Sequence, residues 1–189
     1  MAPHLTEDEI DDLVYFSRAG ENADLDESLA ALAEREKASL AEILLVAKDE
    51  GKSSTLHMAT GNGHLETVRK LLEAFQGRPK EEKQAFVDDA NEHGNTGLHW
   101  AALGGHLDTV KLLLEHGASP ALANERNYVP LDLANFNDKT EVAQYFLSFS
   151  GGLERGNEES GLSSAVGSVE LADDEADKDG APEPSPAAA

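Results

Sequence analysis

Residues 54–64 read STLHMATGNGH and residues 96–106 read TGLHWAALGGH, and this shared pattern decides the fold. The two stretches are offset by 42 residues, and a weaker copy, VPLDLA at residues 129–134, follows the second at an offset of 33 residues. Repetition at a fixed interval of about 20–50 residues is typical of proteins in which similar units stack on their neighbours. The chain is therefore expected to be a solenoid whose core continues from one unit to the next.

The offset of 33 residues and a sequence close to T-P-L-H-x-A are typical of ankyrin repeats, in which each unit has two antiparallel helices and a projecting turn. The larger offset is explained by an insertion at residues 76–85, where a glycine, a proline and a charged run interrupt the pattern. An earlier unit is marked by Leu13, which stands before Gly20 at the distance that separates Leu56 from Gly63. We predict an all-α ankyrin-repeat solenoid of about four helix-turn-helix repeats with degenerate end repeats, at residues 8–45, 50–75, 91–123 and 124–150.

Each repeat contains signals for the start and end of its helices. Thr or Ser at the start of the motif caps the first helix, and Pro130 fits the first helical position of the fourth repeat, where no backbone donor is needed. Gly63 and Gly105 end the first helices of the second and third repeats. Second helices are expected at residues 65–74 and 107–116, because their apolar residues recur at helical spacing. The buried seam between repeats is expected to contain Val68, Leu71, Leu72, Val110, Leu113 and Leu114.

The composition excludes several classes of protein. With 37 acidic and 15 basic side chains the formal net charge is -22, which would repel a phosphate backbone, so no direct nucleic-acid binding is expected. The absence of cysteine excludes a disulfide framework and a thiolate zinc site. No apolar run could span a bilayer, and the acidic residues 1–12 are unlike a secretory or mitochondrial presequence. A soluble intracellular protein without membrane contact is expected.

Residues 151–189 differ in composition from the rest of the chain. They are rich in Gly, Ser, Ala, Pro and acidic residues and contain no aromatic residue. Such a segment cannot bury enough apolar surface to offset the entropy of ordering, so a disordered acidic tail is expected. Two interpretations are open: the tail only keeps the protein soluble, or it is an electrostatic arm that holds a basic partner.

No group of residues points to catalysis, a metal or a cofactor. His57 and His99 occupy the histidine position of the motif, where the ring is expected to link neighbouring turns, and His64 and His106 follow the helix-ending glycines. All four are interpreted as structural, because their spacing does not match a metal site. The Gly-Lys-Ser triplet at residues 51–53 lacks the first glycine of a phosphate-binding loop. We predict a protein that is not an enzyme and has no cofactor and no metal.

The predicted binding residues are those that the repeat leaves free on the turns and on the outer face of the first helices. Trp100 is interpreted as an anchor for a protein partner, the alternative being that it packs on its neighbouring helix. Asp88, Asp89 and Glu92 are expected to form an acidic cluster that meets Lys or Arg of a partner. The full set comprises Met58, Asn62, Asp88, Asp89, Glu92, His93, Asn95, Trp100, Leu103, Glu125, Arg126, Tyr128, Phe136 and Asn137.

Several longer stretches resemble a narrower family. STLHMATGNGHLETVRKLLE at residues 54–73, AFVDDANEHGNTGLHWAALGGHLDTVKLLL at residues 85–114, VAQYFLSF at residues 142–149 and the acidic tail resemble the fungal ankyrin-repeat chaperones of small-subunit ribosomal protein S three. The resemblance covers residues 5–150. It implies a dedicated chaperone that binds this free basic protein, keeps it soluble and escorts it to ribosome assembly, with a place in both cytoplasm and nucleus.

The charge of the chain agrees with such a client. A ribosomal protein without its RNA exposes Lys and Arg, which an acidic partner can cover. The hypothesis is that the concave surface formed by the turns and the first helices holds one structured element of the client through Trp100 and Tyr128. Acidic residues near both ends of the chain then screen the remaining basic surface of the client. The protein is expected to be monomeric before it binds its client. The alternative is a general ankyrin adaptor in signalling or transcription, since ankyrin motifs specify a fold and not a function.

Overall fold

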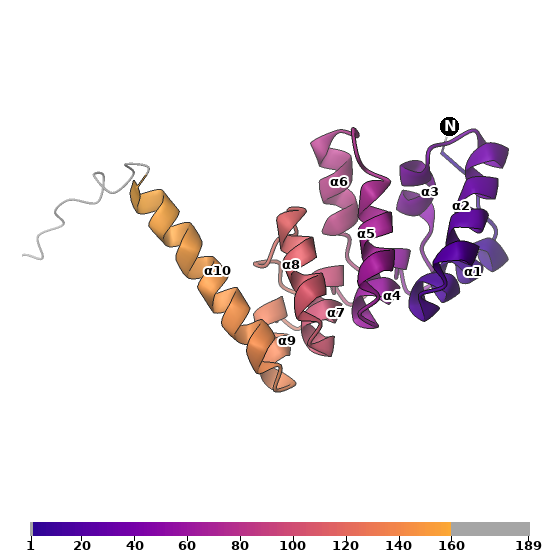
Figure 1. Cartoon of the computed structure of the whole chain (residues 1–189). Coiled ribbons are helices and arrows are strands. Elements are labelled where there is room, and N and C mark those ends of the chain that lie inside the picture. Colours follow the sequence, from indigo (N-terminus) through magenta and orange to yellow (C-terminus); the bar gives the residue numbers. More distant parts are fainter. Residues whose placement is uncertain (1, 160–189) are drawn as a thin grey trace, which may run out of the picture. The chain divides into compact units, whose positions relative to one another are not determined.

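The computed structural model describes residues 2–159 and, for side chains, residues 2–149. Within this range the chain forms ten α-helices and two isolated β-bridges, Lys48 with Ser54 and Ala90 with Thr96. The helices, drawn in Figure 1, are α1 (Glu7–Ala19), α2 (Asn22–Glu36), α3 (Leu40–Val46), α4 (Thr55–Gly61), α5 (Leu65–Glu73), α6 (Lys80–Val87), α7 (Gly97–Gly104), α8 (Leu107–Glu115), α9 (Pro130–Phe136) and α10 (Thr140–Glu159).

The helices form a stack of four repeats. The first helices α1, α4, α7 and α9 pack on one another in that order, and α2, α5 and α8 each pack on the first helix of their own repeat. In the fourth repeat α10 supplies the second helix, with Val142 and Phe146 in the core. The structure therefore confirms the predicted all-α ankyrin-repeat solenoid (Figure 1).

The first and second repeats each contain a third helix. In the second repeat α6 occupies most of the predicted insertion, and its buried Phe86 stacks on Phe75 with ring centroids 4.5 Å apart. In the first repeat α3 buries Ile43 and Leu44, and our sequence analysis did not predict this helix. Its signal is the Ser39 cap, whose hydroxyl accepts a hydrogen bond from the Glu42 backbone N–H at 3.3 Å.

The ends of the first helices follow the predicted signals. Gly63 and Gly105 have φ angles of 72° and 79°, the left-handed region that favours glycine. A Cβ atom at Gly63 would stand 2.5 Å from the His106 ring, so packing of the third repeat on the second also requires glycine at position 63. In the fourth repeat Asp138 takes the left-handed position with φ of 53°, and the aliphatic chain of Lys139 packs on Gly105 where a histidine would otherwise lie.

The predicted seam between repeats is the core of the structure. Leu13, the marker of the first repeat, is fully buried, as is Leu44 on the added helix α3. Burial of apolar side chains in one continuous cluster supplies most of the stabilising free energy of such a stack. The six residues predicted for the seam are all buried, which confirms that prediction: Val68, Leu71, Leu72, Val110, Leu113 and Leu114.

The last helix continues past the predicted end of the folded part. The compact unit extends to Gly151, but α10 runs to Glu159, so residues 151–159 of the expected disordered tail belong to a helix. The rest of the expected tail, residues 160–189, lies outside the described residues. None of the described helices is long and apolar enough to cross a membrane.

Candidate functional site

A pocket of about 360 Å³ lies between the third and fourth repeats, and we call it the aromatic pocket. Its wall comes from two neighbouring turns and from the ends of α7 and α9, which the repeat brings side by side. It brings together eight of the predicted binding residues: His93, Asn95, Leu103, Glu125, Arg126, Tyr128, Phe136 and Asn137. Asn124 and Leu133 complete the lining.

Two exposed aromatic rings dominate this pocket. Phe136 is 64% exposed and Tyr128 is 37% exposed, and the rings meet edge to face with centroids 5.0 Å apart. Aromatic side chains with this much surface outside the core are typical of protein-binding hot spots. The pocket can therefore accept an apolar side chain of a partner between the two rings and Leu103.

Hydrogen bonds hold the turn that carries Tyr128 in place. The Asn124 side-chain oxygen accepts hydrogen bonds from the backbone N–H groups of Arg126 and Tyr128, both at 3.0 Å. The Asn124 amide nitrogen donates to the side-chain oxygen of Asn95 in the preceding turn at 2.8 Å. Because these bonds order the wall before a partner arrives, binding requires little further ordering of this turn.

The two motif histidines link neighbouring turns. His57 Nε2 lies 2.8 Å from the carbonyl oxygen of Asn95, and His99 Nε2 lies 3.0 Å from that of Tyr128. In each ring Nδ1 accepts the backbone N–H at the start of the helix, from Ser54 at 3.0 Å and from Thr96 at 3.1 Å. Nε2 must then carry the proton and donate to the carbonyl, so the rings are neutral. Burial lowers the pKa of both His57 and His99.

The histidines that follow the helix-ending glycines also bond between repeats. His64 Nε2 lies 2.9 Å from the carbonyl oxygen of Arg18, and His106 Nε2 lies 3.1 Å from that of Gly61. Each ring thus contacts the end of the first helix of the preceding repeat. These contacts confirm the structural interpretation of all four histidines. Among the described residues no group of His, Asp and Glu side chains has an arrangement that could hold a metal ion.

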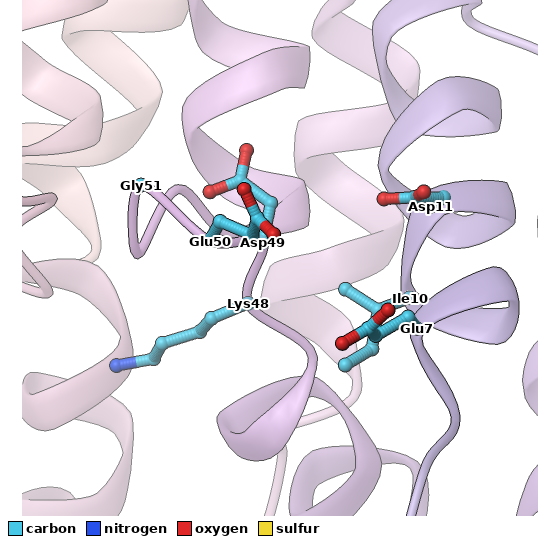
Figure 2. A pocket seen from close by; sticks show the side chains of 7 residues that line it. All are labelled: Glu7, Ile10, Asp11, Lys48, Asp49, Glu50 and Gly51. Carbon is cyan, nitrogen blue, oxygen red and sulfur yellow. The ribbon is translucent and has the colours of Figure 1, made fainter.

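A second pocket, of about 460 Å³, lies between the first and second repeats, and we call it the acidic pocket. Figure 2 shows its lining of Glu7, Ile10, Asp11, Lys48, Asp49, Glu50 and Gly51. Its only cation, Lys48, turns away from α1 and binds the Asp89 carboxylate at 2.6 Å. The pocket therefore presents uncompensated negative charge beside the apolar side chain of Ile10.

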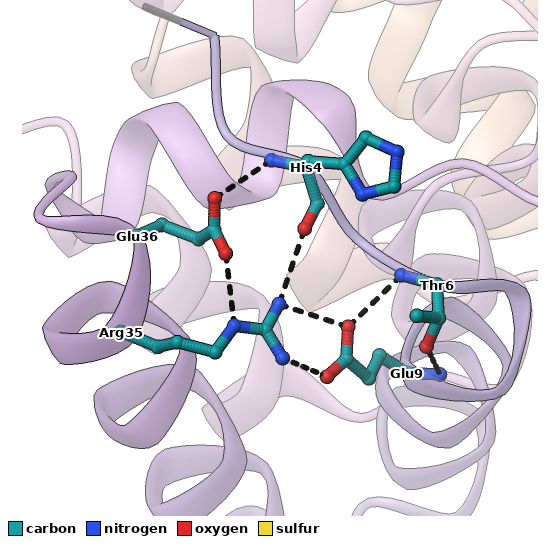
Figure 3. Close-up of polar contacts among 5 residues, drawn as sticks. All are labelled: His4, Thr6, Glu9, Arg35 and Glu36. Atoms are coloured by element: carbon teal, nitrogen blue, oxygen red, sulfur yellow. Dashed lines mark hydrogen bonds and ion pairs between the residues drawn. The ribbon is translucent and has the colours of Figure 1, made fainter.

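A polar network fixes the start of α1 beside the acidic pocket (Figure 3). The Arg35 guanidinium on α2 binds both carboxylate oxygens of Glu9, the carbonyl oxygen of His4 and the Glu36 carboxylate. The Arg35 hydrogen bond, and next the one from the Thr6 backbone N–H, lower the pKa of Glu9 to about 2. The network keeps Glu9 occupied, whereas Glu7 and Asp11 face the pocket.

Two of the predicted partner-binding carboxylates are engaged within the fold. Asp88 accepts hydrogen bonds from the Ser119 backbone and hydroxyl at 2.8 and 2.9 Å and from Gln84 at 2.6 Å. Asp89 pairs with Lys48 and has only 16% of its side chain exposed. The expected acidic cluster of Asp88, Asp89 and Glu92 is therefore reduced to Glu92, because the other two carboxylates hold repeats together.

The remaining predicted residues lie outside both pockets. Trp100 is half-buried, and Gly61 of the preceding repeat lies against it. Its indole N–H is covered and has no hydrogen-bond partner among the described atoms. Packing on the neighbouring helix, the alternative interpretation of Trp100, accounts for this contact. Met58 is half-buried, and the exposed Asn62 donates a hydrogen bond to the carbonyl oxygen of Met58 at 2.9 Å.

Sequence reasoning missed the acidic pocket. Its residues Glu7 and Glu50 occupy the repeat positions of Glu92 and Glu125, which the analysis did select. The signal was present in the alignment that places Leu13 over Leu56. The first repeat has a helix where the other repeats have a turn, and binding residues on turns were predicted only before the third and fourth repeats.

Comparisons with known proteins agree with this architecture. The pattern of the ankyrin-repeat family, three copies, matches residues 28–124 and 81–158. The ankyrin repeat-containing protein YAR1 of Saccharomyces cerevisiae is 38% identical over 145 residues, which cover 76% of this chain and 70% of YAR1. A chain in the crystal structure of the yeast ribosomal protein Rps3 with its chaperone Yar1 superposes with a TM-score of 0.69 and 38% identity, over 77% of this chain and 95% of that chain.

Proposed function

The chain belongs to the ankyrin-repeat family, and from this premise we propose that it is a dedicated chaperone of Rps3, the small-subunit ribosomal protein S three. The observation that carries the proposal is the match to a chain of the Rps3–Yar1 complex, which extends over 95% of that chain at 38% identity. At this identity over nearly the whole length of the matched chain, the similarity extends well beyond the shared motif.

The charge of the chain supports a basic client. Its formal net charge is -22, and the acidic pocket has no free cation. Free ribosomal proteins expose Lys and Arg that normally contact RNA, and these groups promote binding to other polyanions. Complementary charge speeds association with such a protein and disfavours wrong partners. The aromatic pocket adds a contact that salt does not screen, which gives the complex its lifetime.

The proposal includes an escort from the site of synthesis to the site of ribosome assembly. We therefore propose that the protein is present in both cytoplasm and nucleus. Its work is binding and release, without a chemical reaction. Under this proposal the acidic surface substitutes for RNA until the client reaches the pre-ribosome, where RNA displaces it.

The test measures the binding and solubility of purified Rps3 in the presence of the full-length chain. We expect a stable complex at low salt, weaker binding as salt increases, and less aggregation of free Rps3 when the chain is present. An unrelated basic protein, such as a histone, serves as the control and should bind more weakly. Absence of binding to Rps3 at every salt concentration, or equal binding of the control, would contradict the proposal.

A further inference from the structure

The four repeats carry a glutamate at one common position. Six residues before the leucine of each first helix (Leu13, Leu56, Leu98 and Leu131) stand Glu7, Glu50, Glu92 and Glu125, which we call the tip glutamates. All four are exposed. The neighbouring positions vary from repeat to repeat, for example Asp8, Gly51, His93 and Arg126 at the next residue. A shared residue at an exposed position is not explained by packing of the repeats.

The structure places the tip glutamates in a row along the stack. The backbone N–H of Glu92 donates to the Gly51 carbonyl at 2.9 Å, and that of Glu125 donates to the His93 carbonyl at 3.1 Å. Glu92 therefore lies next to Gly51, the residue after Glu50, and Glu125 lies next to His93, the residue after Glu92. Glu7 and Glu50 both line the acidic pocket. Since packed helices are about 8–10 Å apart, the backbone positions of successive tip glutamates recur at about that spacing.

The row ends at the aromatic pocket. Glu125 lines this pocket together with Arg126, so a cation accompanies the last glutamate. At the other end Glu7 and Glu50 have no Lys or Arg partner among the described side chains, because Lys48 is engaged by Asp89. The face thus changes from uncompensated acid at the first repeat to exposed aromatic surface at the fourth.

We propose that one basic segment of the client lies along this row, an inference that rests on the proposed chaperone function. The segment places an apolar side chain against the exposed surfaces of Tyr128 and Phe136 and directs Lys or Arg toward Glu92, Glu50 and Glu7. The cations recur about every 8–10 Å. A helix meets this spacing with a basic residue at every seventh position, which keeps the cations on one face, and a polyproline-II segment does so at every third. Arg126 fixes the direction in which the segment lies along the row, because it repels the cationic part of the segment from the aromatic pocket.

The test compares two variants of the full-length chain with the same change in charge. The first is E7Q/E50Q/E92Q/E125Q, which neutralises the row. The second, E27Q/E34Q/E73Q/E115Q, neutralises four exposed glutamates on the second helices α2, α5 and α8 and serves as the matched control. Calorimetric titration with purified Rps3 measures Kd at low and at high salt. Thermal unfolding of each variant confirms that the fold is retained, and the smaller variant E50Q/E92Q is used if it is not.

We expect the row variant to bind Rps3 about 30-fold more weakly at low salt and the control variant less than about threefold more weakly. The salt dependence of Kd should become shallower only in the row variant. Equal losses in the two variants would overturn the inference, because net charge alone would then explain binding, and so would no loss in either. The proposed function fails separately, if the wild-type chain does not bind Rps3 at all.

Discussion

The acidic pocket and the aromatic pocket occupy equivalent places between repeats, yet they offer opposite chemistry. Ile10 and Asn95 stand at the same repeat position on one side of the two pockets, and Glu50 and Glu125 form the equivalent pair on the other side. The backbone of the repeat is thus a constant frame on which a few free positions set the local chemistry. The acidic end acts at a distance and is screened by salt, whereas the aromatic end acts only in contact. We therefore expect the acidic end to set the rate of association and the aromatic end to set the lifetime of the complex.

The largest effect is expected at the aromatic end. The double substitution Tyr128→Ala/Phe136→Ala removes both exposed rings and should weaken binding to Rps3 by about 2–4 kcal/mol, mostly through faster dissociation. The salt dependence should be unchanged. Tyr15→Ala is the matched control, because Tyr15 is 58% exposed on α1 and lines neither pocket. Surface plasmon resonance at two salt concentrations measures both rates. A similar loss in the control would show that the aromatic pocket has no special role.

The second effect concerns the buried histidines that hold the turns. The pKa values of His57 and His99 are lowered from 6.5, so the unfolded chain binds protons more readily than the folded chain. Stability is therefore full above pH 6.5 and decreases as the pH falls below it, by at most about 1.4 kcal/mol per pH unit for each histidine. His116, whose pKa is also lowered by burial, adds to this loss.

Urea unfolding at pH 7.5, 6.5 and 5.5 measures this dependence, and His99→Gln should reduce its slope. The network at the start of α1 should not respond in this window, because the pKa of Glu9 is about 2. Acidification therefore weakens the hydrogen bond that holds the turn of Tyr128, whereas the Arg35–Glu9 network at the start of α1 stays intact. A stability that is constant from pH 7.5 to 5.5 would disprove the assigned neutral state of the rings.

A third substitution should affect stability and binding in opposite directions. Lys48→Met removes the partner of Asp89, whose side chain is only 16% exposed, and should cost about 1–2 kcal/mol of unfolding free energy. It also removes the only cation from the acidic pocket, so association with Rps3 at low salt should become faster. Lys111→Met is the control, because Lys111 is on α8 and lines neither pocket. Slower association of the Lys48 variant would contradict the role given to the acidic end.

The smallest effect is expected from one carboxylate of the acidic pocket. Asp11→Asn should weaken binding by about 0.2–1 kcal/mol at low salt and have no effect at high salt, because exposed charge pairs contribute little and are screened. Asp108→Asn, an exposed aspartate on α8, provides the comparison. Fluorescence anisotropy with labelled Rps3 measures the change in Kd, which for this free energy is about 1.4- to fivefold.

The repeat motif predicted the frame well because it is local. Thr96, His99 and Gly105 lie within ten positions of one another, and each performs a task that their spacing alone defines: a cap, a bond to the next turn and a helix end. Leu13 could mark the first repeat because one buried leucine and one glycine are enough to fix the register. Eight of the chosen binding residues meet in the aromatic pocket for the same reason.

The parts that sequence reasoning missed depend on contacts between distant residues. Asp88 looked like a free surface carboxylate, and only the fold brings Ser119 to it. Asp89 likewise meets Lys48 across 41 positions of sequence. Helix α3 lies outside the repeat period, so periodicity could not reveal it. The acidic pocket combines α1 with the turn before α4, and the helical start of the first repeat concealed that equivalence.

The contact through which each repeat meets the next recurs with little change. His64 meets the end of α1, His106 meets the end of α4, and the Lys139 chain packs on Gly105 at the end of α7. Because this junction is reused, a duplicate of residues 91–123 placed between the third and fourth repeats should fit both neighbours. The lengthened protein would carry one more tip glutamate and should bind a longer basic segment than the natural chain does.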